Sequence, residues 1–343
     1  MKKVHSTPRY KHFLQKRHEY QLKRTQNPRY YKPYMHTQYN GAIQPKDDPS
    51  SIKAPSIFSI VNNQQEMLNF FRDIKRHMIY NRNIFINMND VTQVTTDAII
   101  YMLLFFDNLR EDYPNLKLNG NFPKEEKSKT LLFHSGFLEK LFKTKNPYDE
   151  IKHKTILKVE TGTDTNSPLA GDIISFALKS LNEKPSYSSR RSYSNIIEAM
   201  SNTNNHAYNE NEKIKKWYLM ALYDEESNKV SFSFLDSGYG IVATVKKRNI
   251  ENFGIYSHVN ILESALNGNI YNNRSQTGLI ERGKGLPSIY SSFQSGHTDN
   301  LVIISNKAFF DAKNNQYIKL KHSFDGTLIS WDFIQNGEKN ETN

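Results

Sequence analysis

Alternating apolar and polar positions in the second half of the chain predict the strands of a sheet. The stretches 215–224 (KKWYLMALYD) and 228–236 (NKVSFSFLD) predict two strands joined by a polar turn. A helix-rich stretch, 256–294, follows this pair. Three more strands are expected after it, at 300–305, 316–322 and 327–333. This order favours an α+β fold with a mainly antiparallel sheet, since a Rossmann fold would alternate strands and helices.

A second α/β pattern lies nearer the start of the chain. The stretch 83–91 (NIFINMNDV) alternates apolar and polar residues and contains β-branched isoleucines, which predicts a strand. The stretch 95–109 (TTDAIIYMLLFFDNL) has a threonine cap candidate, an early acid and a wide apolar stripe, which predicts a buried helix. Polar stretches at 158–172 and 182–194 are expected to be loops or connections. We therefore expect a small α/β domain at 56–150.

Positive charge is concentrated at the start of the chain. The 343 residues carry a net charge of +11, but residues 1–45 hold ten Lys or Arg and a single acid, Glu19. The rest of the chain is nearly neutral. Seven aromatic residues are interleaved with these cations. Because cations neutralise phosphates and rings stack on bases, a basic tail at 1–50 is expected to bind nucleic acid. The alternatives are a flexible extension or an arm that packs on a partner subunit.

Composition excludes several classes of protein. Cysteine is absent, which removes disulfides, thiolate metal sites and thiol nucleophiles. The apolar run at 98–106 is half the roughly 18 residues that a membrane span needs. No apolar signal core follows the charged start. We therefore expect a cytoplasmic protein that does not act in a membrane.

Four short motifs occur in order across residues 198–327. The first places Glu198, Asn202 and His206 at four-residue intervals, so that they share one face of a helix. The second, DSGYGI from Asp236, follows a predicted strand directly. The third is RGKGL at 282–286, before a predicted helix, and the fourth is the DGT that opens the last strand. Each motif alone is weak, because glycine turns and polar helix faces are common.

Together, the four motifs resemble the nucleotide-binding boxes of the histidine-kinase-like (Bergerat-fold, GHKL) ATPases. Those boxes read E-x3-N, D-x-G-x-G, G-x-G-L after a lid, and a late G-T. The first motif is most similar to that of the anti-sigma-factor Ser/Thr kinases, E-A-x-x-N-x-x-x-H-x-Y, which Ala199 and Tyr208 also match. The resemblance implies an α/β two-layer sandwich at 165–337, the Bergerat fold, with a mixed, mainly antiparallel sheet.

The resemblance also implies ATP and Mg²⁺ as cofactors and assigns roles to the matching residues. Glu198 would be the catalytic base, and Asn202 would hold the metal. Asp236 would accept a hydrogen bond from the adenine amino group. The stretch 242–281 would form the lid. The other cofactor-binding positions would be Gly238, Gly240, Arg282, Gly283, Lys284, Gly285, Leu286 and Thr327.

The residue types suit these roles. An amide oxygen is a ligand for a Mg²⁺ ion that keeps several waters, and a carboxylate one helical turn earlier is placed to take a proton from an attacking water. Glycines let the backbone approach a base, and N–H groups at a helix start bind phosphate. Arg274, Arg282 and Lys284 supply positive charge, and which of them contacts the phosphates stays open. His206 is expected to support the helix end.

The stretch 83–109 resembles the STAS-like domains of bacterial partner-switching regulators. In that family a Ser or Thr at the helix start is phosphorylated by a cognate kinase. Thr95 and Thr96 occupy that place here. The alternative is that these threonines only cap the helix.

Three functions remain open from the sequence. The first is an ATP-binding and ATP-hydrolysing regulatory protein, in which the nucleotide state and lid closure switch the interaction with a protein partner or a second copy of the chain. The second is a protein Ser/Thr kinase of the anti-sigma type. The third is a non-catalytic nucleic-acid-binding module that uses the basic tail. Glu198 favours hydrolysis, because a pocket that only bound nucleotide would need no base.

Overall fold

The structure of the chain is a computed structural model. It describes residues 51–80, 83–114, 116–143, 153–204, 215–248, 256–269 and 285–334. The predicted basic tail, 1–50, lies outside these ranges. All of these described residues belong to one compact unit.

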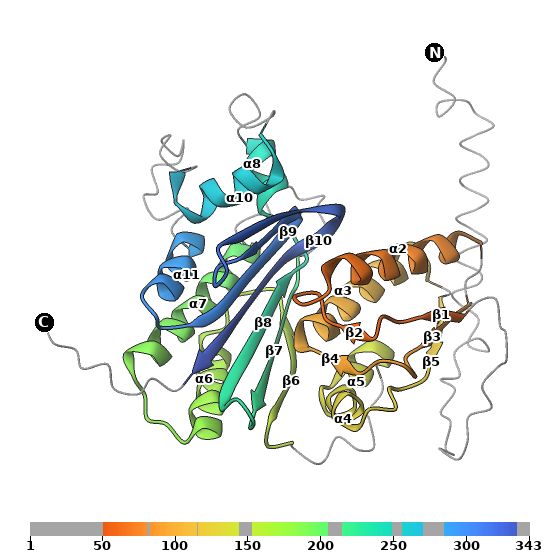
Figure 1. The fold of residues 1–343 in the computed structure, drawn as a ribbon, viewed down its shortest axis with the longest axis horizontal. Coiled ribbons are helices and arrows are strands. Elements are labelled where there is room, and N and C mark those ends of the chain that lie inside the picture. Colours follow the sequence, from red (N-terminus) through yellow and green to blue (C-terminus); the bar gives the residue numbers. More distant parts are fainter. Residues whose placement is uncertain are drawn as a thin grey trace, which may run out of the picture. The chain divides into compact units, whose positions relative to one another are not determined.

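A five-stranded sheet forms the centre of this unit (Figure 1). Its strands lie in the order β6-β7-β8-β10-β9, and every neighbouring pair is antiparallel. The expected α+β class with a mainly antiparallel sheet is therefore confirmed. The strands are β6 (Ile156–Gly162), β7 (Trp217–Asp224), β8 (Lys229–Asp236), β9 (Asp299–Asp311) and β10 (Gln316–Ile334).

Several boundaries differ from the prediction. The stretches 316–322 and 327–333 are not two strands but parts of β10, which continues through an irregularity in its pairing with β9. The stretch 158–172 is not a loop, because it contains the end of β6 and the start of α6 (Ser167–Leu181). The exposed side of an edge strand accepts polar residues, which made β6 resemble a loop. Likewise, 182–194 contains the first turns of α7 (Tyr187–Asn204). The sheet therefore begins before residue 165.

One face of the sheet, called the first face below, packs against the C-terminal helices (Figure 1). These are α6, α7, α8 (Ile241–Arg248), α10 (His258–Leu266) and α11 (Gly285–Gln294). The core between sheet and helices contains Leu219, Phe234 and Trp331 from the strands and Ile173 and Met200 from the helices.

The opposite face, called the second face, is covered by α2 (Gln64–Tyr80) and α3 (Thr96–Asp112) of the N-terminal segment, residues 51–143. The Tyr101 ring of α3 stacks on Phe324 of β10 with 4.4 Å between ring centroids. The Tyr218 hydroxyl of β7 donates to Asp107 of α3 at 2.7 Å. Because β7 is buried on both faces, its sequence WYLMALY is apolar throughout rather than alternating.

The N-terminal segment has its own small parallel sheet, in the order β1-β3-β5. The predicted strand 83–91 ends at Asn87, and the predicted helix 95–109 is α3. The strands and further helices are β1 (Ser51–Lys53), β2 (Ile57–Phe58), β3 (Asn83–Asn87), β4 (Gln93–Val94), β5 (Lys117–Gly120), α4 (Glu126–His134) and α5 (Phe137–Phe142).

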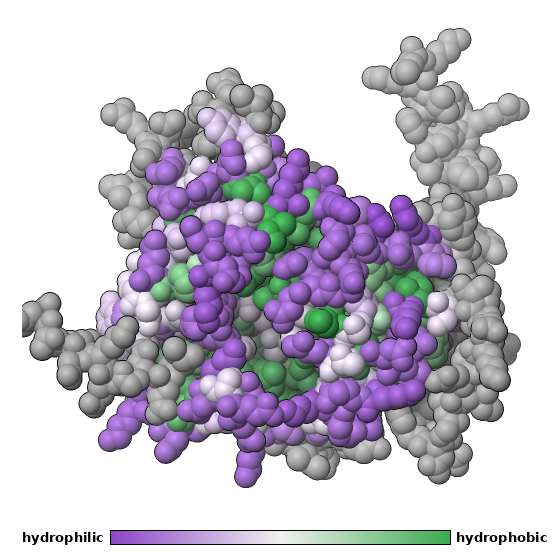
Figure 2. Space-filling model, in the orientation of Figure 1, coloured by the Kyte–Doolittle hydropathy of each residue, from purple (hydrophilic) through white to green (hydrophobic). Residues whose placement is uncertain are grey.

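The surface of the unit is largely hydrophilic in the view of Figure 2, with small apolar areas between polar ones. Large apolar side chains exposed among the described residues come from different elements: Ile57, Phe142, Tyr187, Tyr239 and Tyr256. Within the described part of the chain, every helix is too short or too polar to cross a membrane.

Candidate functional site

One row of residues crosses the whole sheet and carries two of the predicted site residues. Backbone pairing aligns Gly162 with Trp217, Trp217 with Asp236, Asp236 with Thr327, and Thr327 with Ser305. Side chains that pair directly across antiparallel strands point to the same face. This row therefore belongs to the first face, where Trp217 is buried in the core.

Asp236 ends β8 in a partly buried position at the centre of this row. The backbone N–H of Gly238 donates to its Oδ1 at 2.7 Å, and the backbone N–H and hydroxyl of Thr327 also bond to its carboxylate. Loss of hydration raises the pKa of Asp236 to about 6, against the opposing effects of these hydrogen bonds and of Lys215. The carboxylate is therefore mainly ionised at neutral pH and available to a hydrogen-bond donor.

The two glycines after Asp236 meet different constraints. A Cβ atom on Gly238 would lie 2.7 Å from Asp236 Oδ1. Gly240 has a φ of +84°, and a Cβ atom there would lie 2.5 Å from Asn306 Oδ1 and 2.8 Å from Ser305 Oγ. Glycine is therefore required at 240 both for the turn and for the close approach of β9.

Gly326 belongs to the fourth motif, but the sequence assigned it no role of its own. Its φ is +86°, and a Cβ atom there would lie 1.9 Å from the carbonyl oxygen of Asp236. Asn306 pairs with Phe324 and Ser305 with Thr327, so Gly326 lies in a bulge of β10 beside Asp236. The signal was available, because Gly326 directly precedes Thr327 in the fourth motif.

The first motif lies on α7, and its carboxylate and amide face the start of α11. A Cβ atom on Gly285 would lie 2.7 Å from Glu198 Oε2 and 3.0 Å from Asn202 Nδ2. Glu198, Asn202 and Gly285, which the sequence predicted as one site, are therefore brought together. The opposite side of α7 is apolar and buried, with Ile196 and Met200 fully enclosed, as expected from the helical spacing.

Hydrogen bonds further along α7 and α11 fix this contact. The Ser292 hydroxyl donates to Asn195 Oδ1 at 3.0 Å, and Arg191 donates to the carbonyl of Ser288 at 3.2 Å. Leu286, predicted to bind the cofactor, is buried in the first-face core. Its side chain therefore anchors the start of α11.

Other predicted residues lie outside the described ranges. These are His206, Tyr208, Arg274, Arg282, Gly283 and Lys284, together with part of the predicted lid. The cation that would contact a phosphate thus remains a prediction.

Thr95 and Thr96 lie at the start of α3 against other parts of the unit. Thr95 is the N-cap residue, but its hydroxyl bonds to the carbonyl of Phe58 at 3.4 Å and makes no cap bond. The Thr96 hydroxyl is buried and lies 2.7 Å from Ser233 Oγ of β8. Phosphorylation of Thr96 would require α3 to leave the sheet.

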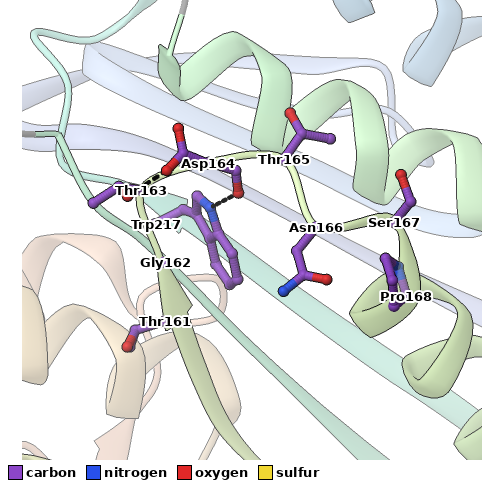
Figure 3. A pocket seen from close by; sticks show the side chains of 9 residues that line it. All are labelled: Thr161, Gly162, Thr163, Asp164, Thr165, Asn166, Ser167, Pro168 and Trp217. Carbon is purple, nitrogen blue, oxygen red and sulfur yellow. Dashed lines mark hydrogen bonds between the residues drawn. The ribbon is translucent and has the colours of Figure 1, made fainter.

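An open hollow of about 440 Å³ lies at the edge of the sheet, between the end of β6 and the start of α6 (Figure 3). It is lined by residues 161–168 and Trp217. The Trp217 indole N–H donates to the carbonyl of Asp164 at 3.0 Å. A Cβ atom on Gly162 would lie 2.4 Å from the indole, so glycine is needed there. Trp217 thus connects this hollow to the strand position next to Asp236.

The chain matches no protein-family model and no curated protein. The interpretation of the site therefore depends on the residues that the fold brings together: a carboxylate with nearby glycines at the centre of the sheet, and a carboxylate and an amide at the start of α11.

Proposed function

We propose that this chain binds Mg-ATP on the first face of its sheet and hydrolyses it, and that the nucleotide state switches its interaction with a protein partner. The proposed fold is a Bergerat-type sandwich. The observation that carries the proposal is the contact of Gly285 with both Glu198 and Asn202. This contact joins the first and third motifs, and the residues that meet lie more than 80 positions apart in the sequence.

The adenine would bind beside Asp236. A carboxylate accepts the hydrogen bond of the adenine amino group, whereas guanine presents a carbonyl there and would be repelled. A carboxylate has about four acceptor positions, so the bonds from Gly238 and Thr327 leave room for one more donor. Glycine at 238 and 240 keeps the backbone free of side chains beneath the base.

The phosphates would bind at the start of α11. The first N–H groups of a helix have no partner within the helix and, with the helix dipole, attract anions. Glycine at 285 lets this backbone lie directly against α7. The Asn202 amide would supply an oxygen atom, the donor type that Mg²⁺ prefers. When bound, Mg²⁺ would neutralise charge on the triphosphate.

Glu198 would act as the general base. It would take a proton from a water whose oxygen bonds to the terminal phosphorus as the bond to the ADP oxygen breaks. Release of free phosphate is favoured over phosphorylation of the chain at Thr96, because the Thr96 hydroxyl is buried and bonded to Ser233.

The test measures ATP binding by calorimetry and phosphate release with Mg²⁺. Wild-type protein should bind ATP more tightly than GTP and release phosphate. Glu198→Gln should bind ATP but lower phosphate release about 100-fold or more, within the usual range for loss of a general base. Asn202→Ala should lose the Mg²⁺ dependence of binding.

Glu225→Gln is the matched control, because Glu225 is an exposed carboxylate in the turn between β7 and β8, outside the predicted lid. It should behave as wild type. If wild-type protein does not bind ATP, or if Glu198→Gln hydrolyses it normally, the proposal is wrong.

A further inference from the structure

Two consecutive residues of β9, Ser305 and Asn306, hold the loop that follows Asp236. The backbone N–H of Ile241 donates to Ser305 Oγ at 2.7 Å, and that of Ala243 donates to Asn306 Oδ1 at 3.0 Å. The Asn306 Nδ2 group in turn donates to the carbonyl of Tyr239 at 2.9 Å. Three hydrogen bonds thus cross from β9 to residues 239–243.

These bonds replace a helix cap that the local sequence does not provide. The first N–H groups of a helix need acceptors, which a Ser, Thr, Asp or Asn at the N-cap usually supplies. Here α8 begins directly after Gly240, which has no side chain. A larger residue at 240 would collide with Asn306 Oδ1, so the acceptors for α8 come from a distant strand.

The backbone of β9 and β10 is shaped to present these two side chains. Asn306 has a φ of +54°, a left-handed conformation that asparagine adopts more easily than most residues. It lies opposite the bulge of β10 that contains Gly326, and Ser305 is fully buried in the same row as Asp236. The bulge that brings Gly326 to the Asp236 backbone therefore also orients the Asn306 side chain toward residues 239–243.

Lys307, the next residue of β9, also holds a segment that follows the Asp236 loop. The backbone N–H of Lys307 donates to His258 Nδ1, in the first turn of α10, at 3.2 Å. Residues 305–307 thus hold the first turns of two helices that follow the Asp236 loop.

We propose that Ser305 and Asn306 are positioning residues of the nucleotide site. They act through residues 238–243, which they hold so that Asp236 and the glycine backbone are ready for the base. They do not contact the nucleotide themselves. This inference rests on the proposed ATP-binding function, and it predicts a role in affinity rather than in the hydrolytic step at Glu198.

The decisive variant is Asn306→Gly. Glycine accepts the left-handed φ without strain, so the substitution removes the two hydrogen bonds to residues 239–243 and leaves the backbone conformation available. Asn315→Gly is the matched control. Asn315 has a φ of 47° and lies in the turn between β9 and β10. Ser305→Ala is the second variant and removes the bond from Ile241 and the longer bond, 3.4 Å, that the Ser305 hydroxyl donates to Asn306 Oδ1.

The measurements are KM and kcat for ATP hydrolysis, the melting temperature, and hydrogen exchange of the amides at 241–244. Asn306→Gly should raise KM about 10-fold, as expected for two lost hydrogen bonds, and change kcat less than about 2-fold. It should also speed the exchange of the Ile241 and Ala243 amides without ligand. Ser305→Ala should show a smaller rise in KM, and Asn315→Gly none.

A KM equal to that of wild type in Asn306→Gly, or the same rise in Asn315→Gly, would overturn this inference alone. A fall in kcat with an unchanged KM would also overturn it. If wild-type protein does not bind ATP, both this inference and the proposed function fail.

Discussion

Two aspartates lie at opposite ends of the same β8–β10 ladder and have opposite surroundings. Asp236 ends β8 and pairs with Thr327, whereas Asp332 lies near the end of β10 and pairs with Ser231. Asp236 belongs to the first face. The alternation along β10 places Asp332 on the second face, with Leu328.

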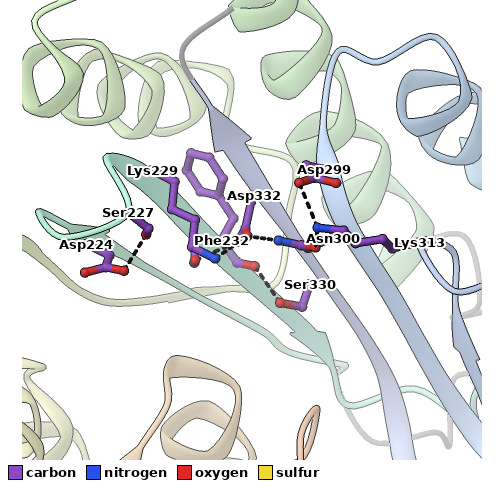
Figure 4. A network of polar contacts seen from close by, with 10 residues as sticks. Asp224, Ser227, Lys229, Phe232, Asp299, Asn300, Lys313, Ser330 and Asp332 are labelled. Carbon is purple, nitrogen blue, oxygen red and sulfur yellow. Dashed lines mark hydrogen bonds and ion pairs between the residues drawn. The ribbon is translucent and has the colours of Figure 1, made fainter.

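Asp332 is surrounded by a positively charged side chain and by neutral hydrogen-bond donors (Figure 4). Lys229 Nζ lies 2.7 Å from its Oδ2, the Ser231 hydroxyl donates to Oδ1 at 2.6 Å, and Asn300 donates to Oδ2 at 2.5 Å. Lys229 and Ser231 come from β8 and Asn300 from β9, so this aspartate ties three neighbouring strands together. Its charge is balanced inside the protein.

Among the described residues, the hydrogen bonds to Asp236 come from Gly238 and Thr327 rather than from a cation, and its pKa is raised to about 6. A carboxylate that loses hydration without a hydrogen-bonded counter-charge lowers stability, and such groups are frequent at functional sites. The comparison teaches that carboxylates with the same backbone setting can serve opposite purposes. One stabilises the sheet, and the other, in the proposed function, would hold a charge ready for a ligand.

The largest expected effect is the destabilisation caused by Asp332→Ala. This variant leaves Lys229, whose side chain is 28% exposed, without its partner. The free energy of unfolding should fall by about 3 kcal/mol, measured by chemical denaturation. Asp299→Ala is the control in the same network, because its partner Lys313 is 55% exposed. It should cost about 1 kcal/mol or less. If the two variants lower the free energy of unfolding equally, Asp332 stabilises the sheet no more than an exposed ion pair does.

Asp236→Asn should change the free energy of unfolding in the opposite direction and stabilise the protein. Removing the charge should raise the free energy of unfolding by about 1–2 kcal/mol at pH 7.5. This figure is less than the full pKa difference implies, because Asp236 is partly exposed. The same variant should lose most ATP binding, measured by calorimetry. A less stable variant, or one that binds ATP as wild type does, would contradict the assignment of Asp236 to a ligand.

The smallest effect is a pH dependence that separates the wild type from Asp236→Asn. The carboxyl ionises near 3.8 in the unfolded chain and near 6 in the folded one. Between these values the folded state binds more protons, so wild-type stability falls as pH rises from about 4 to about 6. The advantage of Asp236→Asn should therefore be absent near pH 4, grow to about pH 6, and then stay constant. Denaturation at several pH values checks this. A constant difference at all pH values would show that another group causes the effect.

Much of the first face could be predicted from the sequence. The polar spacing of Glu198 and Asn202 and the apolar spacing of Ile196 and Met200 are helical, so one helix with a buried side and a polar side was predictable. The glycines after Asp236 signalled a close backbone approach. The class of the sheet followed from its alternating stretches. These properties are local, because periodicity and turn chemistry operate within about ten residues.

The missed residues depend on contacts between distant strands. Ser305 and Asn306 have the composition of an ordinary strand end, and only the pairing of β9 with β10 brings them to residues 239–243. The cover of the second face by α2 and α3 was missed for the same reason, although the unbroken apolar run in β7 was a sign that both faces are buried.

By itself, the sequence determined the helices, most strands and the glycine loops, because backbone preference and hydrophobic periodicity depend on residues that are close together in the sequence. Only the tertiary structure decided that Gly285 meets Glu198 and Asn202, that a bulge brings Gly326 to Asp236, and that Lys229 balances Asp332 but not Asp236. The physical reason is that close approach and charge balance depend on strand order and register, which arise from packing of the whole unit.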